Sequence, residues 1–174
     1  MQGASRSTMG SKNALHLYFS EFDEFYQGGE KMTFEKSCGA VVFRNERRDG
    51  ALQRYVLMIK HSSQGHYSFP KGHVEAGETE IKTAEREVFE ETAVRIHINE
   101  KFRQPVYYRP KAGVKKEVVY FLAFTRQTEI KPRPGEIAEV AWIPAEEAEG
   151  LLTHDNDKRV LSLAIQYITE KNNK

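Results

Sequence analysis

Short, mostly apolar runs separated by polar turns recur along the chain and predict strands. Residues 38–43 and 55–59 are two such runs, each of strand length, and the charged stretch 45–50 between them ends in Asp49-Gly50, a hairpin pattern. Pro70 ends a shorter extended piece. The strands predicted in chain order are 38–43, 55–59, 67–69, 96–108, 117–124 and 139–143.

Apolar residues at helical spacing predict three helices. The first runs from about Thr79, a good N-cap residue, to about Thr92, and Ile81, Ala84 and Val88 share its core face. The second covers 144–152 and starts at a proline, which is favoured in a first helical turn. The third is capped by Asp155 or Asp157, and its predicted apolar face is Val160, Leu163, Ala164, Tyr167 and Ile168.

Strands flanked by helices on both sides indicate an α/β protein, an α/β/α sandwich around a mixed sheet. A length of 174 residues suits one domain, which we place at residues 32–174. Residues 1–31 are expected to be an N-terminal extension, because residues 1–13 are small and polar. Within it, the aromatic and acidic stretch 15–26 is expected to pack as a short helix or strand, or else to be foreign to the natural chain.

Composition gives little support for bulk electrostatic binding. The net charge is +1, so neither a membrane surface nor a stable nucleic-acid partner is expected, and a monomer or homodimer is consistent with the sequence. The one cysteine, Cys38, lies in an apolar run, which indicates a buried, inert thiol and suits a cytoplasmic location. No apolar stretch is long enough to span a bilayer, and no secretory signal is visible.

Three carboxylates stand together on the helix predicted at 79–92. Glu87, Glu90 and Glu91 lie at i, i+3 and i+4, and like charges at this spacing repel one another. A solvated acidic face is the plain interpretation. The alternative is a hard divalent cation, Mg²⁺ or Mn²⁺, which offsets the repulsion.

The wider pattern favours the cation. Gly72, five residues, Glu78, seven residues and then Arg86-Glu87-Val88-x-Glu90-Glu91-x-Ala93-Val94 resembles the Nudix box, G-x5-E-x7-R-E-U-x-E-E-x-G-U, where U is a bulky aliphatic residue. Only the last glycine differs. This resemblance implies a metal-dependent hydrolase that cleaves a nucleoside diphosphate linked to another group, with the Nudix α/β/α fold.

The resemblance also implies roles for the box residues. Glu90 and Glu91 would be metal ligands, the carbonyl of Gly72 a third, and Glu87 either a ligand or the base that deprotonates water. Which carboxylate acts as the base stays open, because it varies within the family.

Other family positions carry over to the loops. An ion pair between Arg86 and Glu78 would fix the box loop against the helix, and a plain surface pair is the alternative. Glu136, and next Glu139, would add a metal ligand or base, unless both are solvated loop residues. At Ala93 the family has glycine, often in a left-handed conformation that costs alanine on the order of 1 kcal/mol and that one more helical turn would avoid. We expect this difference to affect stability more than catalysis.

Three features at the entry to the box and beyond it resemble the asymmetric bis(5′-nucleosyl)-tetraphosphate hydrolases of this family. They are the segment 69–73, which contains Pro-Lys-Gly-His, the stretch 116–123, which matches K-x-V-x-Y-[WF]-L-A, and the acidic loop with the helix that follows it at 136–148. Lys71, His73 and Lys116 would supply positive charge for a tetraphosphate.

Adenine stacking is assigned to a tyrosine, with Tyr107, Tyr108 and Tyr120 as candidates. Tyr107 and Tyr108 point to opposite sheet faces, so at most one reaches the site. Tyr120 alternates with apolar neighbours, and a core position is its alternative. His61 and His66 lack zinc-type spacing and are interpreted as non-ligands.

The predicted function is cleavage of diadenosine tetraphosphate to ATP and AMP. A house-cleaning nucleoside triphosphate pyrophosphatase, an RNA 5′-pyrophosphohydrolase and a diphosphoinositol phosphatase remain alternatives within the class. A nucleotide-sugar hydrolase has weaker resemblance. Outside the class, a catalytically silent nucleotide-sensing module is the alternative, and the complete carboxylate set argues against it.

Overall fold

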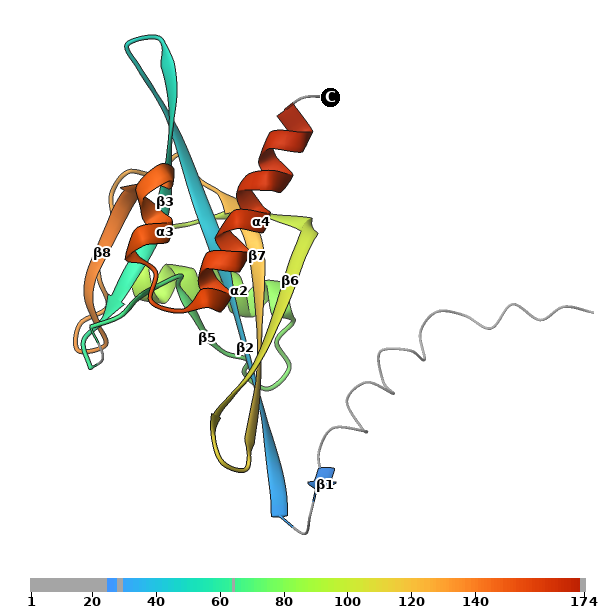
Figure 1. The fold of residues 1–174 in the computed structure, drawn as a ribbon. Helices are drawn as coiled ribbons and strands as arrows, with labels where there is room; N and C mark the ends of the chain where they lie inside the picture. The colour runs from blue at the N-terminus through green and yellow to red at the C-terminus, as the bar shows by residue number, and fades with distance from the viewer. Residues whose placement is uncertain (1–24, 28–29, 64, 173–174) are drawn as a thin grey trace, which may run out of the picture.

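The computed structural model describes residues 25–27, 30–63 and 65–172. One mixed sheet forms its centre, with strand order β4-β3-β2-β7-β6, and β1 and β5 pair with β2 while β8 pairs with β3 (Figure 1). The β2–β7 pair is parallel, and the other pairs are antiparallel. The strands are β1 Phe25–Gln27, β2 Glu30–Arg48, β3 Ala51–His61, β4 Tyr67–Ser68, β5 Lys71–His73, β6 His97–Lys111, β7 Val114–Phe124 and β8 Ile137–Pro144.

Helices cover both faces of the sheet, which confirms the predicted α/β/α sandwich. Helix α2 (Glu80–Thr92) packs on one face, and α3 (Ala145–Leu151) and α4 (Asp155–Asn172) lie on the other (Figure 1). Alternation along β2 supplies both cores, because successive side chains of a strand point to opposite faces. Val41 and Phe43 join the α4 side, whereas Ala40 and Val42 join the α2 side.

The α4 core is the larger. Its buried members from α4 include Val160, Ala164 and Ile168, as predicted, and also Leu161. Leu163 and Tyr167 are only partly buried at its edge. The apolar face of α4 is therefore wider than the predicted stripe.

Two long hairpins extend the sheet beyond its core (Figure 1). The predicted turn at 45–50 is too long, because Asn45–Arg48 stay paired with Ala51–Arg54 and only Asp49-Gly50 turns. The strand predicted at 96–108 is likewise too short, since β6 continues to Lys111 past an irregularity. At the ends of both hairpins, hydrogen bonds between the backbones of the paired strands maintain the extended structure without an alternating apolar pattern.

Helix α4 begins at Asp155, so Asp155 and Asp157 both lie inside its first turn and neither precedes it as an N-cap would. The prediction that one of them caps the helix is wrong. Asp157 is inside the first turn, where its backbone N–H donates to the carbonyl of His154. Of the stretch 15–26, Phe25 and Tyr26 belong to β1, and residues 15–24 lie outside the described residues. The domain boundary at residue 32 stays a prediction, although β2 begins at Glu30.

Cys38 is fully buried in β2, and burial raises the pKa of its thiol to about 12. An uncharged, enclosed thiol is a poor nucleophile, in line with the prediction. In the described part of the chain, no helix has the length and apolar character that a membrane span requires.

Candidate active site

The predicted helix has the predicted start. The side chain of Thr79 accepts a hydrogen bond from the Lys82 N–H at 3.2 Å, which caps the first turn of α2. At the other end the helix stops at Thr92, as predicted, and Ala93 does not continue it. Ala93 adopts φ 60° and ψ 16°, and its N–H donates to the Phe89 carbonyl. The left-handed cap is thus kept without the glycine that usually occupies it.

Arg86 fastens the box loop to the helix. Its Nε and Nη2 donate to the two Glu78 carboxylate oxygens at 2.7 and 2.9 Å, and Nη2 also donates to the His73 carbonyl at 2.9 Å. Arg86 Nη1 lies 2.7 Å from Glu87 Oε1. Hydrogen bonds from Arg86 and then Thr83 lower the pKa of Glu78 to about 2. The pair is a bidentate fork with further partners, rather than a simple surface contact.

Glu87 lies directly against the backbone of Gly72. A Cβ placed on Gly72 would stand 2.0–2.2 Å from the three carboxyl atoms of Glu87, so only glycine leaves room for this carboxylate. Glu87 is buried, and burial raises its pKa against the lowering effect of Arg86. The box glycine and the first carboxylate of the helix therefore form one close-packed unit.

Glu91 is the most enclosed carboxylate of the box. It is 2% exposed, and its Oε2 accepts a hydrogen bond from the Lys71 backbone N–H at 3.0 Å. Burial raises the pKa of Glu91 to about 8, and the nearby positive charge of Lys71 opposes that rise. In the folded protein, the positive charge near the Glu91 carboxylate is therefore too small to offset the effect of burial.

The third box carboxylate is exposed and meets the loop before β8. Glu90 Oε2 lies 3.0 Å from Arg133 Nη1, and Arg133 Nε lies 3.2 Å from Glu136 Oε2. The charge of Glu136 contributes to the raised pKa of both Glu87 and Glu91, which places it near them. Glu139 instead accepts a hydrogen bond from the Tyr67 hydroxyl at 3.0 Å.

Within the described residues no group of three or more acidic, histidine or cysteine side chains is arranged as a finished metal cage. The donor set nevertheless fits a hard divalent cation. It consists of the close-packed Gly72–Glu87 unit and the buried carboxylate of Glu91, which forms no ion pair with any described residue. A few such oxygens suffice, since Mg²⁺ keeps several of its own ligands from water or phosphate.

Positive groups from two strands lie on the sheet beside the box. Lys116 Nζ lies 3.4 Å from His73 Nε2 and 3.6 Å from Glu35 Oε2. His73 Nε2 is in turn 3.5 Å from Glu35 Oε2. Desolvation by burial lowers the pKa of Lys116, with Glu35 opposing it. The structure thus brings together Lys116 and His73, which are far apart in sequence.

Tyr120 is not available for stacking in this structure. Its ring is 1% exposed, its edge meets Phe69 with centroids 5.8 Å apart, and its hydroxyl donates to Asp157 at 3.1 Å. The core alternative describes it correctly, because the position falls on the α4 side of β7 beneath that helix. We withdraw its assignment to substrate binding.

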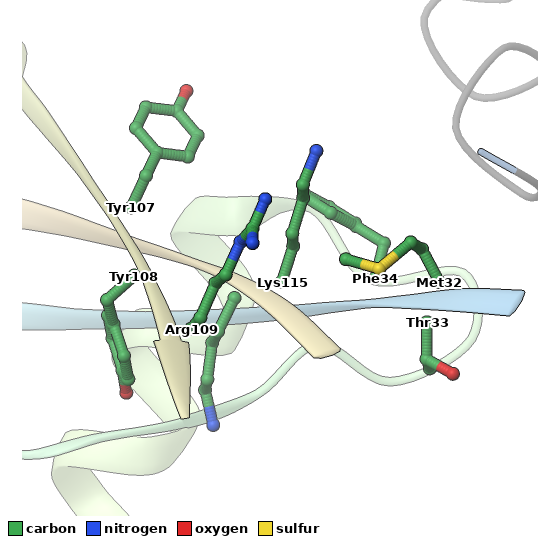
Figure 2. A pocket seen from close by; sticks show the side chains of 8 residues that line it. Met32, Thr33, Phe34, Tyr107, Tyr108, Arg109 and Lys115 are labelled. Atoms are coloured by element: carbon green, nitrogen blue, oxygen red, sulfur yellow. The ribbon is translucent and has the colours of Figure 1, made fainter. Parts of the chain in front are cut away.

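Tyr107 and Tyr108 do point to opposite sides (Figure 2). The hydroxyl of Tyr107 donates to Glu117 at 3.0 Å, whereas Tyr108 shares its strand position with Lys116 across the β6–β7 ladder. Of the two, Tyr108 is therefore on the face that carries Lys116.

An open cavity of about 470 Å³ lies at the end of β2, β6 and β7 (Figure 2). It shares Tyr108 and Lys116 with the predicted substrate residues but includes no box carboxylate. Its lining residues are Met32, Thr33, Phe34, Tyr107, Tyr108, Arg109, Lys115 and Lys116.

The two histidines interpreted as non-ligands, His61 at the end of β3 and His66 in the loop after it, make local contacts. His61 Nε2 lies 3.3 Å from the Ser68 hydroxyl, and the ring of His66 meets that of His154 edge-on at 5.5 Å. Burial, together with Lys71, lowers the pKa of His61.

A family model described as the NUDIX domain matches residues 33–164, which is most of the chain. The chain belongs to the Nudix family. The predictions of family, of the Nudix fold and of a Nudix hydrolase as the enzyme class are confirmed.

Relatives with assigned names include the asymmetrical bis(5′-nucleosyl)-tetraphosphatases. The mouse protein is 29% identical over 140 residues, which cover 76% of this chain and 95% of that protein. A Mycobacterium tuberculosis protein named as the mutator protein MutT4 is 31% identical over 138 residues. That match covers 77% of this Nudix chain, which spans just over half, 56%, of the length of that relative.

Among solved structures, a Caenorhabditis elegans Ap4A hydrolase in a binary complex superposes with a TM-score of 0.68. It is 25% identical, and the match covers 78% of this chain and 98% of the other. The NUDIX domain of Shewanella oneidensis NrtR, solved with ADP-ribose, gives a TM-score of 0.65 over 92% of this chain at 18% identity, which shows the fold alone.

Sequence reasoning missed two charged residues of this Nudix site. Glu35 joins Lys116 and His73 only because β2 and β7 pair in parallel with Glu35 opposite Lys116, and no local pattern encodes that register. Arg133 could have been noticed, since it is a cation between two prolines, three residues before the predicted Glu136.

Proposed function

We propose that this Nudix hydrolase cleaves diadenosine tetraphosphate asymmetrically to ATP and AMP, with Mg²⁺ or Mn²⁺ as cofactor. The observation that carries the proposal is the pair of enclosed carboxylates, Glu87 and Glu91, with the charge of Lys71 near Glu91 and the contact between Lys116 on β7 and His73 on β5. The carboxylates suit a divalent cation, and the basic side chains suit a chain of phosphates.

The residues that would hold the cation are the carboxylates of Glu87, Glu90, Glu91 and Glu136, with the carbonyl of Gly72. A bound divalent cation would neutralise phosphate charge and lower the pKa of a water molecule. Glu87 or another of these carboxylates would accept the proton of the attacking water. Arg86 contributes indirectly, because its contacts with Glu78 and Glu87 fix the loop and the helix in one geometry.

The substrate would lie along the sheet face that carries Lys116. Lys71, His73 and Lys116 would bind the phosphates, and Tyr108 would stack on an adenine, an interaction worth about 1–3 kcal/mol per base. The named tetraphosphatase relatives, matched over nearly their whole length, support this substrate class.

The enclosed, unpaired Cys38 suits a reducing compartment, so we place the enzyme in the cytoplasm.

The experiment is product analysis with diadenosine tetraphosphate and Mg²⁺. Parallel reactions contain dGTP, ADP-ribose or 5′-triphosphorylated RNA, which represent the other substrate classes. We expect ATP and AMP in equal amounts from the tetraphosphate, and loss of both products in Glu91→Gln.

Symmetric products, or turnover of another substrate alone, would contradict the tetraphosphate proposal while keeping a metal-dependent hydrolase. No turnover of any substrate by folded protein with saturating metal would instead favour the silent nucleotide-sensing module.

A further inference from the structure

The loop between β7 and β8 holds Arg133 in a defined place. A proline stands on each side of Arg133 and restricts the backbone. Two backbone hydrogen bonds tie this loop to the last turn of α2: Lys131 N–H to the Thr92 carbonyl at 2.9 Å, and Arg133 N–H to the Glu91 carbonyl at 3.2 Å. The backbone of Arg133 is therefore held in place beside the box carboxylates, which limits where its side chain can reach.

The Arg133 guanidinium joins two carboxylates from different elements. Its Nη1 is 3.0 Å from Glu90 on α2, and its Nε is 3.2 Å from Glu136 just before β8. The Arg133 side chain is 44% exposed, so the guanidinium is accessible to water and to ligands.

Both partners of Arg133 are carboxylates to which the proposed function assigns a cation. An oxygen that binds a divalent cation in its inner sphere gives up much of its attraction to a guanidinium, and the cation repels that guanidinium directly. Arg133 and a divalent cation therefore compete for Glu90 and Glu136.

We propose that Arg133 changes partners when metal binds: it pairs with Glu90 and Glu136 in the metal-free protein and binds a substrate phosphate in the metal-loaded enzyme. This inference rests on the proposed function, since it assumes the cation at these carboxylates. A guanidinium suits the second partner because its planar fork donates two hydrogen bonds to one phosphate. Arg133 is thus a phosphate-binding residue that also weakens metal binding before substrate arrives.

The first measurement is Mn²⁺ binding to the metal-free protein, without nucleotide, by the loss of the free Mn²⁺ signal in electron paramagnetic resonance. Arg133→Ala should bind Mn²⁺ about threefold to tenfold more tightly than the wild type, the range that two partly exposed ion pairs supply. Arg133→Lys keeps the charge and should stay nearer the wild type. Arg126→Ala removes an exposed arginine with no box contact and should leave the affinity unchanged.

The second measurement is steady-state hydrolysis of diadenosine tetraphosphate at saturating Mg²⁺. Both Arg133→Ala and Arg133→Lys should raise KM about tenfold, with a smaller change in kcat, because a lysine lacks the fork. Circular dichroism and thermal melting of each variant verify that the loop substitution leaves the protein folded.

Unchanged or weaker Mn²⁺ binding in Arg133→Ala would overturn the exchange of partners, and so would a KM equal to that of the wild type. Failure of the proposed function has a different signature. There the wild type itself binds no Mn²⁺, or binds it without turning over the tetraphosphate.

Discussion

At Gly72 the absent side chain is what matters, because the Glu87 carboxylate occupies the space in which a Cβ would stand. Gly72→Ala should therefore displace Glu87 and lower kcat/KM about a hundredfold, since small misplacements at a reacting centre are costly. The measurement is kcat/KM beside the melting temperature. The control is Gly150→Ala on α3, where a Cβ meets nothing within 4 Å and activity should be unchanged.

Ala93 is a single residue in an unfavourable backbone conformation. Its φ of 60° costs alanine on the order of 1 kcal/mol, which glycine avoids. Ala93→Gly should raise the melting temperature by about 2–4 °C, the shift expected of about 1 kcal/mol in a protein of this size. Ala112→Gly, at an exposed turn position without a positive φ, should bring no gain, and an equal gain there would contradict the explanation.

At the scale of elements, one arginine holds the box loop on α2. Arg86→Lys keeps the charge but cannot form the fork on Glu78 and reach the His73 carbonyl and Glu87 as well. We expect kcat/KM to fall tenfold or more while the protein stays folded. Arg103→Lys breaks a similar fork, on Glu80 at the start of α2 rather than on the cluster of Glu87, Glu90 and Glu91, and should leave kcat/KM near that of the wild type. Equal losses in both variants would mean that the effect is only one of stability.

A cluster of ion pairs around Glu80 joins the start of α2 to the sheet. Glu80 Oε1 lies 2.6 Å from Lys36 on β2 and 2.7 Å from Arg103 on β6. The hydrogen bond from Arg103, followed by that from Lys36, outweighs burial and lowers the pKa of Glu80 to about 2.

Acid should therefore remove the contribution of Glu80 to stability. Because the folded pKa is below the unfolded value of about 4.3, the contribution is complete above that value and is lost as the pH falls toward 2. Urea unfolding should find Glu80→Gln about 1 kcal/mol less stable than the wild type at pH 6. The difference should nearly vanish at pH 2, and a difference that is constant with pH would exclude this origin.

At the scale of the whole molecule, folding brings the box carboxylates close together, and their negative charges then repel one another. If they hold Mg²⁺ or Mn²⁺, the cation binds the folded state and stabilises it by about 2.7 kcal/mol at a hundred times its Kd. Thermal melting in Mn²⁺ should therefore exceed melting in EDTA by several degrees. The gain should be much smaller in Glu91→Gln, and an equal gain would place the cation elsewhere.

The sequence by itself determined the helix, its N-cap at Thr79 and the set of carboxylates on one side of it, because these depend on local spacing and the helical period. The strand cores followed from apolar runs, whereas phosphate binding by Lys71, His73 and Lys116 stays a prediction from the family resemblance. The exposed ends of the long hairpins were missed, because backbone pairing there needs no apolar pattern.

Only the tertiary structure decided how each charged or aromatic group is used. Packing between distant segments buries Glu91 and Tyr120 and leaves Glu90 exposed, and the parallel pairing of β2 with β7 puts Glu35 beside Lys116. The ion pair between Arg133 and Glu90 depends on a loop folding back on α2. Burial, pKa and ion pairing are properties of three-dimensional neighbours, and residues far apart in a chain become neighbours only when the whole domain packs.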